Sequence, residues 1–486
     1  MKATRREFLR RASLLGMSGT AAPLALQMAA VGAAAAAAPP AQGTAPGAAP
    51  AAGTSGDAVG NAVGNSVSHY KALVCIFLYG GNDPYNTIVP YDPERHARYF
   101  QARADIALAR DKLAATALKP KDPLPGQQAY ALAPGLAPLL PWFERGQLAV
   151  QLNVGPLAAP TSKRDYIGAR VPLPPKLFSH NDQQSYWQAL APEGAASGWG
   201  GRLADLFIAA NANATFTGVT AGGSALLLAG RHVSAYRVSP AGSTPIELLQ
   251  RDTYGSTTCT DLMRLLITQS GEHLFERQHA AIVARSMRAD ARLRAALAGD
   301  AVQGAFATPL AAQLKIVARM IAARETLGMR RQVFFVTQNG YDNHDGLNDV
   351  HPGLLRELGG AMAEFQQALD ALGVAGQVTT FTASEFGRTL VSNGNGSDHG
   401  WGGHHLVLGG AVRGGRFYGR HPDLALDGPG FVDHGRMLPD VAVDQFGATL
   451  ATWFGAGAAS LDDVFPNLRR FDGRDLGFMH DAARDS

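Results

Sequence analysis

Cysteine, charge and basic clusters are all scarce in this chain of 486 residues. It has only two cysteines, Cys75 and Cys259, so its fold does not depend on a disulfide framework. Cys75 lies in an apolar run, where a buried free thiol is the expected state, and the sequence leaves open whether the two cysteines pair. Lys and Arg form no basic stripe beyond the N-terminus, which argues against a nucleic-acid partner.

A dinucleotide-binding fingerprint is also missing. The first apolar run ends in Gly80-Gly81-Asn82-Asp83, which lacks the G-x-G-x-x-G spacing, so a redox enzyme with an organic cofactor is disfavoured. Hydrophobic residues make up 46% of the chain and charged residues 17%, which allows a substantial core. No window after the N-terminal region has the length and apolarity of a membrane span, so we expect no stable span.

The N-terminal region has the pattern of an export signal. Thr4–Arg10 contains paired arginines and precedes a moderately apolar stretch and then an alanine run with A-x-A cleavage options at 33–38. This order predicts a signal peptide over 1–38, and the paired arginines favour the twin-arginine route. We therefore expect the twin-arginine translocase to be a partner during export. The protein would be exported in its folded state and be periplasmic or secreted. A membrane anchor is the alternative, but the stretch is only weakly apolar.

The rest of the chain divides into a linker and one folded domain. Residues 39–66 are rich in Ala, Pro and Gly, which predicts a disordered linker, and we expect a single domain over 67–486. Helical patterns alternate there with apolar runs and polar loops, which predicts an α/β fold with a mostly parallel central sheet flanked by helices. The predicted strands are 71–79, 147–154, 332–337 and 377–383, and the clearest helices are 314–328 and 355–372. Residues 203–303 give the weakest signal, for which we predict Ala-rich helices.

Ligand-type side chains follow the ends of these strands. The strand at 377–383 leads into a Gly-rich loop that extends to His405, and the other strands end in loops with Asp and His. Because parallel strands place their carboxyl ends at one edge of a sheet, we expect these side chains to converge. The converging residues are Asp83, Asp342, His344, Glu385 and His399. Two alternatives remain open: a polar surface loop, and a simple turn at Asn82 and Asp83.

The start of a helix near Ser179 is a further candidate element. A hydroxyl at a helix N-terminus either caps the helix or gains as a nucleophile from the unpaired N–H groups and the dipole. Arg202, in the segment Gly198–Arg202, is a candidate contact for an anion.

Several motifs together resemble the bacterial family known as domain of unknown function 1501. They are YKALVCIFLYGGNDPYNTIVP, LFSHNDQQSYWQ, GWGGR, NGYDNHD, SEFGRTLVSNGNGSDHGWGGHHLVLGGAVRGGRFYG and DQFGATLATWFG. That family is placed in the alkaline phosphatase superfamily, with sulfatases and cofactor-independent phosphoglycerate mutases. The resemblance implies an alkaline-phosphatase-like three-layer sandwich and an ancestry in metal-dependent phosphoryl or sulfuryl transfer.

The resemblance also implies roles for individual residues. The nucleophile would be Ser179, with Thr161 in reserve, and Asp83 would bind the first metal. Arginine would offset charge on the transferring group. The candidate catalytic residues are Ser179, His180, Arg202 and Arg388, and the candidate metal ligands are Asp83, Asp342, His344, Glu385, Asp398, His399 and His404.

Two departures from the superfamily pattern bear on the metal. The spacing from Asp342 to His344 is shorter than expected, and Phe386 stands where a ligating His is expected. We therefore expect one or two divalent ions, with Zn, Mn, Mg and Ca all open. The leading hypothesis is a periplasmic metal-dependent hydrolase of phosphate or sulfate esters that acts on a small-molecule or anionic substrate. The alternative, which Phe386 supports, is a non-catalytic, metal-stabilised binding or assembly protein of the envelope on the same fold.

Overall fold

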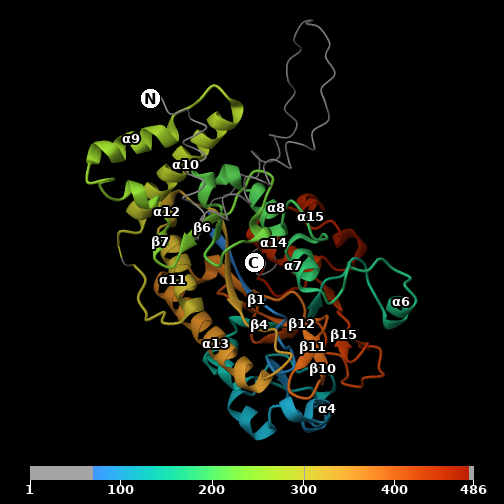
Figure 1. The fold of residues 1–486 in the computed structure, drawn as a ribbon. Helices are drawn as coiled ribbons and strands as arrows, with labels where there is room; N and C mark the ends of the chain where they lie inside the picture. Colours follow the sequence, from blue (N-terminus) through green and yellow to red (C-terminus); the bar gives the residue numbers. More distant parts are fainter. Residues whose placement is uncertain (1–68, 300, 481–486) are drawn as a thin grey trace, which may run out of the picture. The chain divides into compact units, whose positions relative to one another are not determined.

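Strand β1, Lys71–Tyr79, lies at the centre of a ten-stranded sheet. The computed structural model describes residues 69–299 and 301–480 (Figure 1), so the predicted signal peptide and linker lie outside the described residues. Seven consecutive residues of β1 are buried because the strand is covered on both faces, as a central parallel strand requires. It pairs in parallel with β8, Arg331–Asn339, on one side and with β9, Val378–Ala383, on the other.

The sheet is parallel at its centre and has antiparallel pairings toward both ends. Its strand order is β13-β4-β12-β9-β1-β8-β5-β6-β7, with β16 also paired to β4. From β9 through β6 the pairings are parallel, whereas β12 runs antiparallel to both β4 and β9. The other strands are β4 Leu148–Gly155, β5 Gly218–Thr220, β6 Tyr236–Ser239, β7 Gly242–Ser243, β12 Gly403–Leu408, β13 Arg416–Tyr418 and β16 Val441–Ala442.

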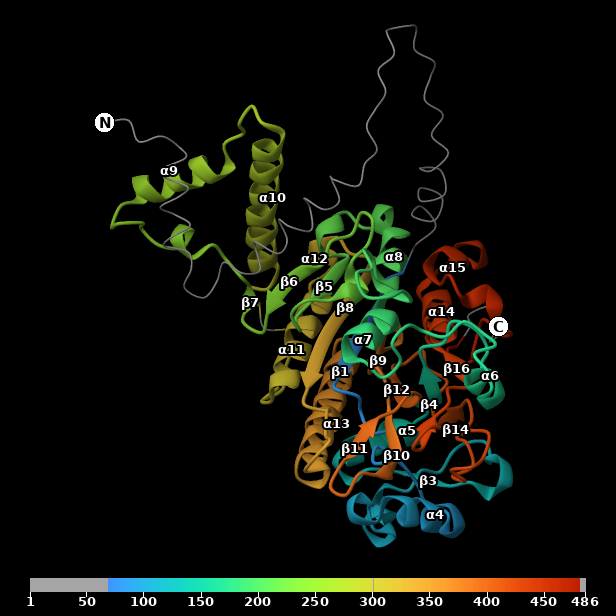
Figure 2. The ribbon, with the colours of Figure 1, turned by 45° about the vertical axis from the view of Figure 1, so that its right-hand side comes forward.

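Helices cover both faces of the sheet, which confirms the predicted three-layer α/β sandwich. Val74 and Ile76 of β1 belong to a core shared with α11, Pro309–Ala322, and α13, Leu347–Ala371. Leu73, Cys75 and Phe77, which alternate with them, face a second core. That core is shared with α7 His180–Ala189, α8 Trp199–Asp205, α14 Val443–Phe454 and α15 Ala458–Val464. Figure 2 shows the two groups of helices on opposite sides of the sheet.

Smaller elements surround this sandwich. The remaining α-helices are α4 Pro93–Arg103, α5 Leu140–Glu144, α6 Lys163–Ile167, α9 Thr257–Thr268, α10 Leu274–Ala296 and α12 Arg324–Leu327. Short 3-10 helices are η1 Ala104–Ile106, η2 Arg110–Thr116, η3 Pro125–Gln127, η4 Pro134–Leu139, η5 Ile208–Ala210, η6 Ala214–Phe216, η7 Leu226–Leu228, η8 Glu247–Leu249, η9 Ala375–Gln377 and η10 Leu468–Arg470. Two-stranded sheets pair β2 Ile88–Pro90 with β3 Tyr130–Leu132, β10 Arg388–Ser392 with β11 Ser397–His399, and β14 Phe431–Val432 with β15 Arg436–Met437.

The structure differs from the sequence predictions in three places. The helix predicted over 314–328 is two helices, α11 and α12. The segment 203–303 contains strands β5 to β7 as well as helices. These runs are too short to show a period in the sequence, and they form strands because β5 pairs with β8, β6 with β5, and β7 with β6. The Gly-rich loop after β9 is an antiparallel hairpin, β10–β11, and His404 and His405 belong to strand β12.

Two further findings concern the cysteines and the membrane. Cys75 and Cys259 are both free, and burial raises the pKa of the Cys75 thiol well above its ordinary value. Within the ranges that the structure describes, no helix has the length and apolarity to cross a membrane.

Candidate metal centre

The carboxyl ends of β1, β9 and β8 meet at one edge of the sheet. Glu385, two residues after β9, accepts a hydrogen bond of 2.9 Å from the backbone N–H of Gly80, directly after β1. Arg388 bridges to the third strand, because its Nη1 donates both to the Gly80 carbonyl at 3.2 Å and to Asp342 Oδ1 at 2.8 Å. Asp342 follows β8. The two strands that flank β1 are therefore each followed by a carboxylate that is tied to the turn after β1, Glu385 directly and Asp342 through Arg388.

Three histidines surround the Asp342 carboxylate. The Nε2 atoms of His344 and His399 lie 3.2 Å and 3.3 Å from Oδ1, and Nε2 of His180 lies 3.3 Å from Oδ2. The ligand atoms of His180, Asp342 and His399 all fall within 4.8 Å of one another. His180 is the first residue of α7, His344 follows β8 and His399 ends β11, so distant parts of the chain converge here.

The other ring nitrogen of each histidine is held by an oxygen. His180 Nδ1 lies 2.9 Å from Glu385 Oε1, and His344 Nδ1 lies 3.2 Å from Asp398 Oδ1. His399 Nδ1 lies 2.7 Å from the backbone carbonyl of Phe178. Carboxylate and carbonyl oxygens only accept, so each Nδ1 carries a hydrogen. In the neutral ring, which is the form that binds a metal, each Nε2 then keeps its lone pair. Histidines that bind metals are oriented in this way by their second nitrogen.

Glu385 is locked in its orienting role. Its side chain is fully buried, and Oε1 accepts from Gly80 N–H, Gln184 Nε2 and His180 Nδ1, each at 2.9 Å. Three donors on one oxygen fix the position of the carboxylate. Asp398 orients His344 from the more exposed side, where Asn393 Nδ2 donates to the same oxygen at 3.1 Å.

Phe178 holds a strained backbone conformation beside this centre. Its φ of 73° is in the left-handed region, which costs a residue with a side chain about 1–3 kcal/mol. The conformation presents the Phe178 carbonyl to His399 Nδ1, while the Phe178 ring lies 4.2 Å from the Arg436 guanidinium carbon. Backbone strain of this kind persists where surrounding contacts fix it, and here those contacts are residues of the candidate centre.

The surroundings of His180 and His399 shift the pKa values of these two rings in opposite directions. The hydrogen bond to Glu385 raises the pKa of His180 against the effect of burial, and burial lowers the pKa of His399. Partial burial of Asp342 would raise its pKa, but the hydrogen bond and charge of Arg388 hold it below the ordinary value. Asp342 therefore remains a carboxylate, which is the form that binds a cation.

These residues fit a single divalent transition metal. His180 Nε2 is buried and has no hydrogen-bond partner among the described residues. His344 Nε2 and His399 Nε2 lie 2.9 Å apart, and two lone pairs at this distance repel unless a cation or a proton lies between them. The His180 and His399 imidazoles with the Asp342 carboxylate suit zinc and similar metals, whereas magnesium and calcium prefer all-oxygen sets. His344 adjoins this group through His399.

Comparison with known proteins identifies the family. A family model described as "Protein of unknown function (DUF1501)" matches residues 70–428. The chain belongs to this family. No curated protein matches this DUF1501 chain. A solved structure titled "Crystal structure of Ps i-CgsB in complex with k-i-k-neocarrahexaose" is 9% identical, with 84% of this chain and 78% of that chain covered, and its TM-score of 0.35 is too low to support an inference.

Asp83, a predicted ligand, is not brought into the group. It is buried, forms an ion pair with Arg103, and accepts from the backbone N–H groups of Tyr85 and Asn86 at 3.0 Å and 3.1 Å. Ser397 Oγ lies 3.3 Å from its second oxygen. These contacts agree with the alternative that Asp83 organises the turn after β1.

His404 is buried in strand β12 instead of lying in the loop. Its Nδ1 accepts from the backbone N–H of Asn153 at 3.1 Å, and burial lowers its pKa well below the ordinary value. Its ring lies 4.9 Å from that of His421, another buried histidine. His404 therefore belongs to an interior polar cluster and not to the group around Asp342.

The predicted arginine contacts are already occupied by protein groups. Arg202 donates to the carbonyls of Ala189, Ser197 and Val464, which ties α8 to its neighbours. Arg388 is fully buried and donates to Asp342, to the Gly80 carbonyl and to the Ser397 carbonyl. Arg388 thus positions Asp342, and neither arginine presents its donors to a substrate.

The two predicted nucleophiles differ in their partners. Ser179 lies next to His180 and its Oγ donates to Asp182 Oδ2 at 2.8 Å, whereas Thr161 donates to the Ala159 carbonyl at 2.8 Å. Only Ser179 therefore has a carboxylate as its acceptor.

The sequence did not indicate Phe178 or Arg436. Phe178 acts through its backbone carbonyl, which no residue type reveals, and Arg436 lies in a short strand far along the chain. His180 was predicted as a catalytic residue, and its place beside Asp342 instead gives it a ligand's geometry.

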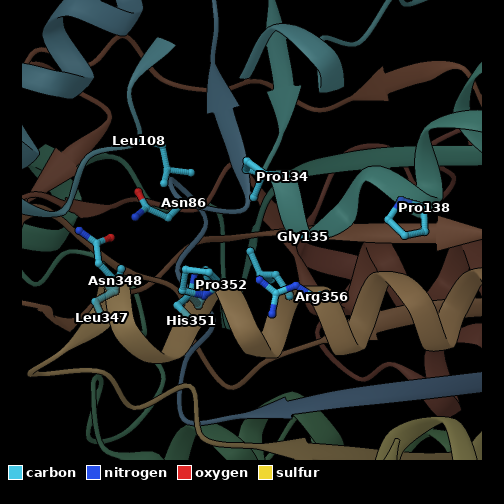
Figure 3. Close-up of a pocket in the computed structure, with 12 residues that line it drawn as sticks. Asn86, Leu108, Pro134, Gly135, Pro138, Leu347, Asn348, His351, Pro352 and Arg356 are labelled. Atoms are coloured by element: carbon cyan, nitrogen blue, oxygen red, sulfur yellow. The ribbon is translucent and has the colours of Figure 1, made fainter. Parts of the chain in front are cut away.

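A separate pocket lies away from this centre. It has a volume of about 260 Å³ and is lined by the first turns of α13 and by residues of η4 (Figure 3). Asn86 and His351 are both buried polar residues of its lining. His351 Nε2 lies 3.0 Å from Asn82 Oδ1, and burial lowers the pKa of His351 to about 4. His351 is therefore neutral at pH 7, and none of the histidines around Asp342 lines this pocket.

Proposed function

We propose that this DUF1501 protein is a metal-dependent hydrolase of phosphate or sulfate esters, with one divalent ion held by His180, His344, His399 and Asp342. The observation that carries the proposal is the common orientation of the three imidazoles, each with Nδ1 on an oxygen and Nε2 facing one carboxylate. Zinc suits this donor set best. A bound divalent ion would act as a Lewis acid on an oxygen of the ester.

The side chains around the ligands have distinct tasks. Glu385 and Asp398 hold the His180 and His344 tautomers, and Arg388 keeps Asp342 ionised and oriented. Such oriented surroundings are worth about tenfold to a hundredfold in metal affinity.

Ser179 is the proposed nucleophile. Its Oγ would attack the phosphorus or sulfur atom as its proton passes to Asp182, and the ester's alcohol would leave with a proton from solvent. The hydrogen bond from Ser179 Oγ to Asp182 supports this choice over Thr161, which has only a carbonyl acceptor.

Phe386 supports a single ion in place of the superfamily's pair. The Phe386 ring is buried and lies 4.9 Å from the His180 ring and 4.7 Å from the His399 ring. It forms an apolar wall on one side of the histidines, where it offers no donor atom. This arrangement agrees with a reduced site derived from the alkaline phosphatase superfamily, and twin-arginine export would place the protein in the periplasm.

The second candidate is a non-catalytic envelope protein that a metal stabilises. The same apolar wall supports it, because Phe386 removes one ligand that two-metal catalysis would use. This candidate predicts metal binding without turnover.

The test combines metal content with an ester screen. We expect one equivalent of zinc by mass spectrometry in the exported protein, and loss of that metal in His399→Ala and Asp342→Ala. His279→Ala, an exposed histidine on α10, is the matched control and should retain the metal. Metal-loaded protein should hydrolyse aryl phosphates or sulfates, and Ser179→Ala should not. Folded protein without metal would contradict the proposal, and metal without turnover would favour the second candidate.

A further inference from the structure

We propose that Arg436 binds the anionic group of the substrate beside the metal centre. This inference rests on the proposed function, since it assigns the recognition of a phosphate or sulfate group to one residue outside the ligand set. Arg436 begins β15 in a hairpin whose turn includes His434 and Gly435, both at positive φ. The sequence alone gives no reason to single it out.

Two contacts fix the plane of the Arg436 guanidinium. Its Nε donates to the backbone carbonyl of His399 at 2.8 Å, and its central carbon lies 4.2 Å from the Phe178 ring. A guanidinium lying on an aromatic face is stabilised by the cation–π interaction and loses little further freedom on binding. Arg436 is therefore preorganised before any ligand arrives.

Both contacts belong to the candidate centre itself. His399 is one of the ligands, and Phe178 supplies the carbonyl that holds His399 Nδ1. The guanidinium is thus held by His399, whose Nε2 faces Asp342, and by Phe178, which orients the His399 ring. An anionic group that reaches this metal centre comes close to Arg436.

The two terminal nitrogens of Arg436 are available for a ligand. In the ranges 69–299 and 301–480, neither nitrogen has a hydrogen-bond or ion-pair partner, and the residue is half-buried. Arg388 and Arg202 differ, because carbonyls or Asp342 occupy their donors. Two parallel N–H groups match two oxygens of a phosphate or sulfate group.

The chain offers a matched control for this geometry. Arg110 on η2 also donates its Nε to a backbone carbonyl, that of Tyr91 at 2.8 Å, and lies 4.6 Å from the Tyr91 ring. Arg110 therefore has the same local architecture without a neighbouring metal ligand. If Arg436 had only a structural role, its replacement should affect anion binding no more than the replacement of Arg110 does.

The experiment measures binding of inorganic phosphate and sulfate to the full chain by calorimetry, with and without one equivalent of zinc. We expect Arg436→Gln to weaken anion binding by about tenfold to a hundredfold, the loss of charged hydrogen bonds. Arg436→Lys should recover part of the affinity, because it restores charge without the paired N–H groups. Arg110→Gln should bind as the wild type does.

The readouts separate this proposal from the proposed function. Zinc content is measured in the same samples, and Arg436→Gln should retain it. Unchanged anion affinity in folded, zinc-loaded Arg436→Gln, or no anion binding by the wild type, would overturn the role of Arg436. Absence of zinc from the wild type would overturn the metal proposal instead, and an Arg436-dependent affinity for phosphate would then still support the anion site.

Discussion

His344 and His399 face each other through their Nε2 atoms at 2.9 Å, while each Nδ1 donates to an oxygen. Neither ring can relieve this contact by changing its tautomer without losing its Nδ1 hydrogen bond. A cation shared between the two lone pairs removes the repulsion and joins the loop after β8 to β11.

This arrangement predicts that zinc stabilises the folded protein. Zinc at a hundredfold excess over its dissociation constant should raise the free energy of unfolding by about 2.7 kcal/mol. Thermal unfolding with zinc and with a chelator measures the effect. His344→Ala should lose it, His279→Ala should keep it, and equal melting temperatures of the wild type in both conditions would count against the site.

Glu385→Gln tests whether the orientation of His180 matters. The amide is a weaker acceptor than the carboxylate that now receives three hydrogen bonds, so His180 should be held less firmly. We expect the zinc affinity to fall by about tenfold to a hundredfold in chelator competition. Glu357→Gln is the control. Glu357 accepts a hydrogen bond from the backbone N–H of Leu310, in the first turn of α11. Equal affinities in the two variants would show that Glu385 has no orienting role.

Asp83→Ala separates a structural carboxylate from a metal ligand. Removing Asp83 leaves the buried Arg103 guanidinium without its ion-pair partner, which costs about 3–5 kcal/mol of stability. Urea unfolding should show this loss, while the zinc content of the folded protein should stay at the wild-type level. Loss of zinc with unchanged stability would instead restore the sequence-based prediction that Asp83 is a ligand.

Asp444 predicts how stability changes with pH. Burial raises the pKa of this carboxyl to about 7 from 3.8, and its Oδ2 has no hydrogen-bond partner among the described residues. In the unfolded chain this carboxyl ionises near pH 4, whereas in the folded protein it stays protonated until about pH 7. The free energy of unfolding therefore falls by roughly 4 kcal/mol as the pH rises from about 4 to 7. Asp444→Asn should remove this part of the pH dependence in urea unfolding. Parallel curves for the variant and the wild type would contradict the assignment.

Much of the sheet could be predicted because its signals are local. The run at 71–79 matches β1 to the residue, since a strand buried on both faces needs a continuous apolar sequence and the following glycines end it. The same reasoning anticipated β4, β8 and β9 within a few residues. Strands β5 to β7 were missed because they are two to four residues long and are stabilised by pairing with distant segments.

The sequence alone determined which strand ends would meet, because parallel strands with right-handed crossovers leave little choice. Tertiary structure decided which side chains there face one another. It turned Asp83 toward Arg103, gave Glu385 to His180 as an orienting partner, and fixed Arg436 between Phe178 and His399. Such assignments depend on differences of a few ångströms between segments far apart in the chain, and residue types and spacings carry no record of those distances.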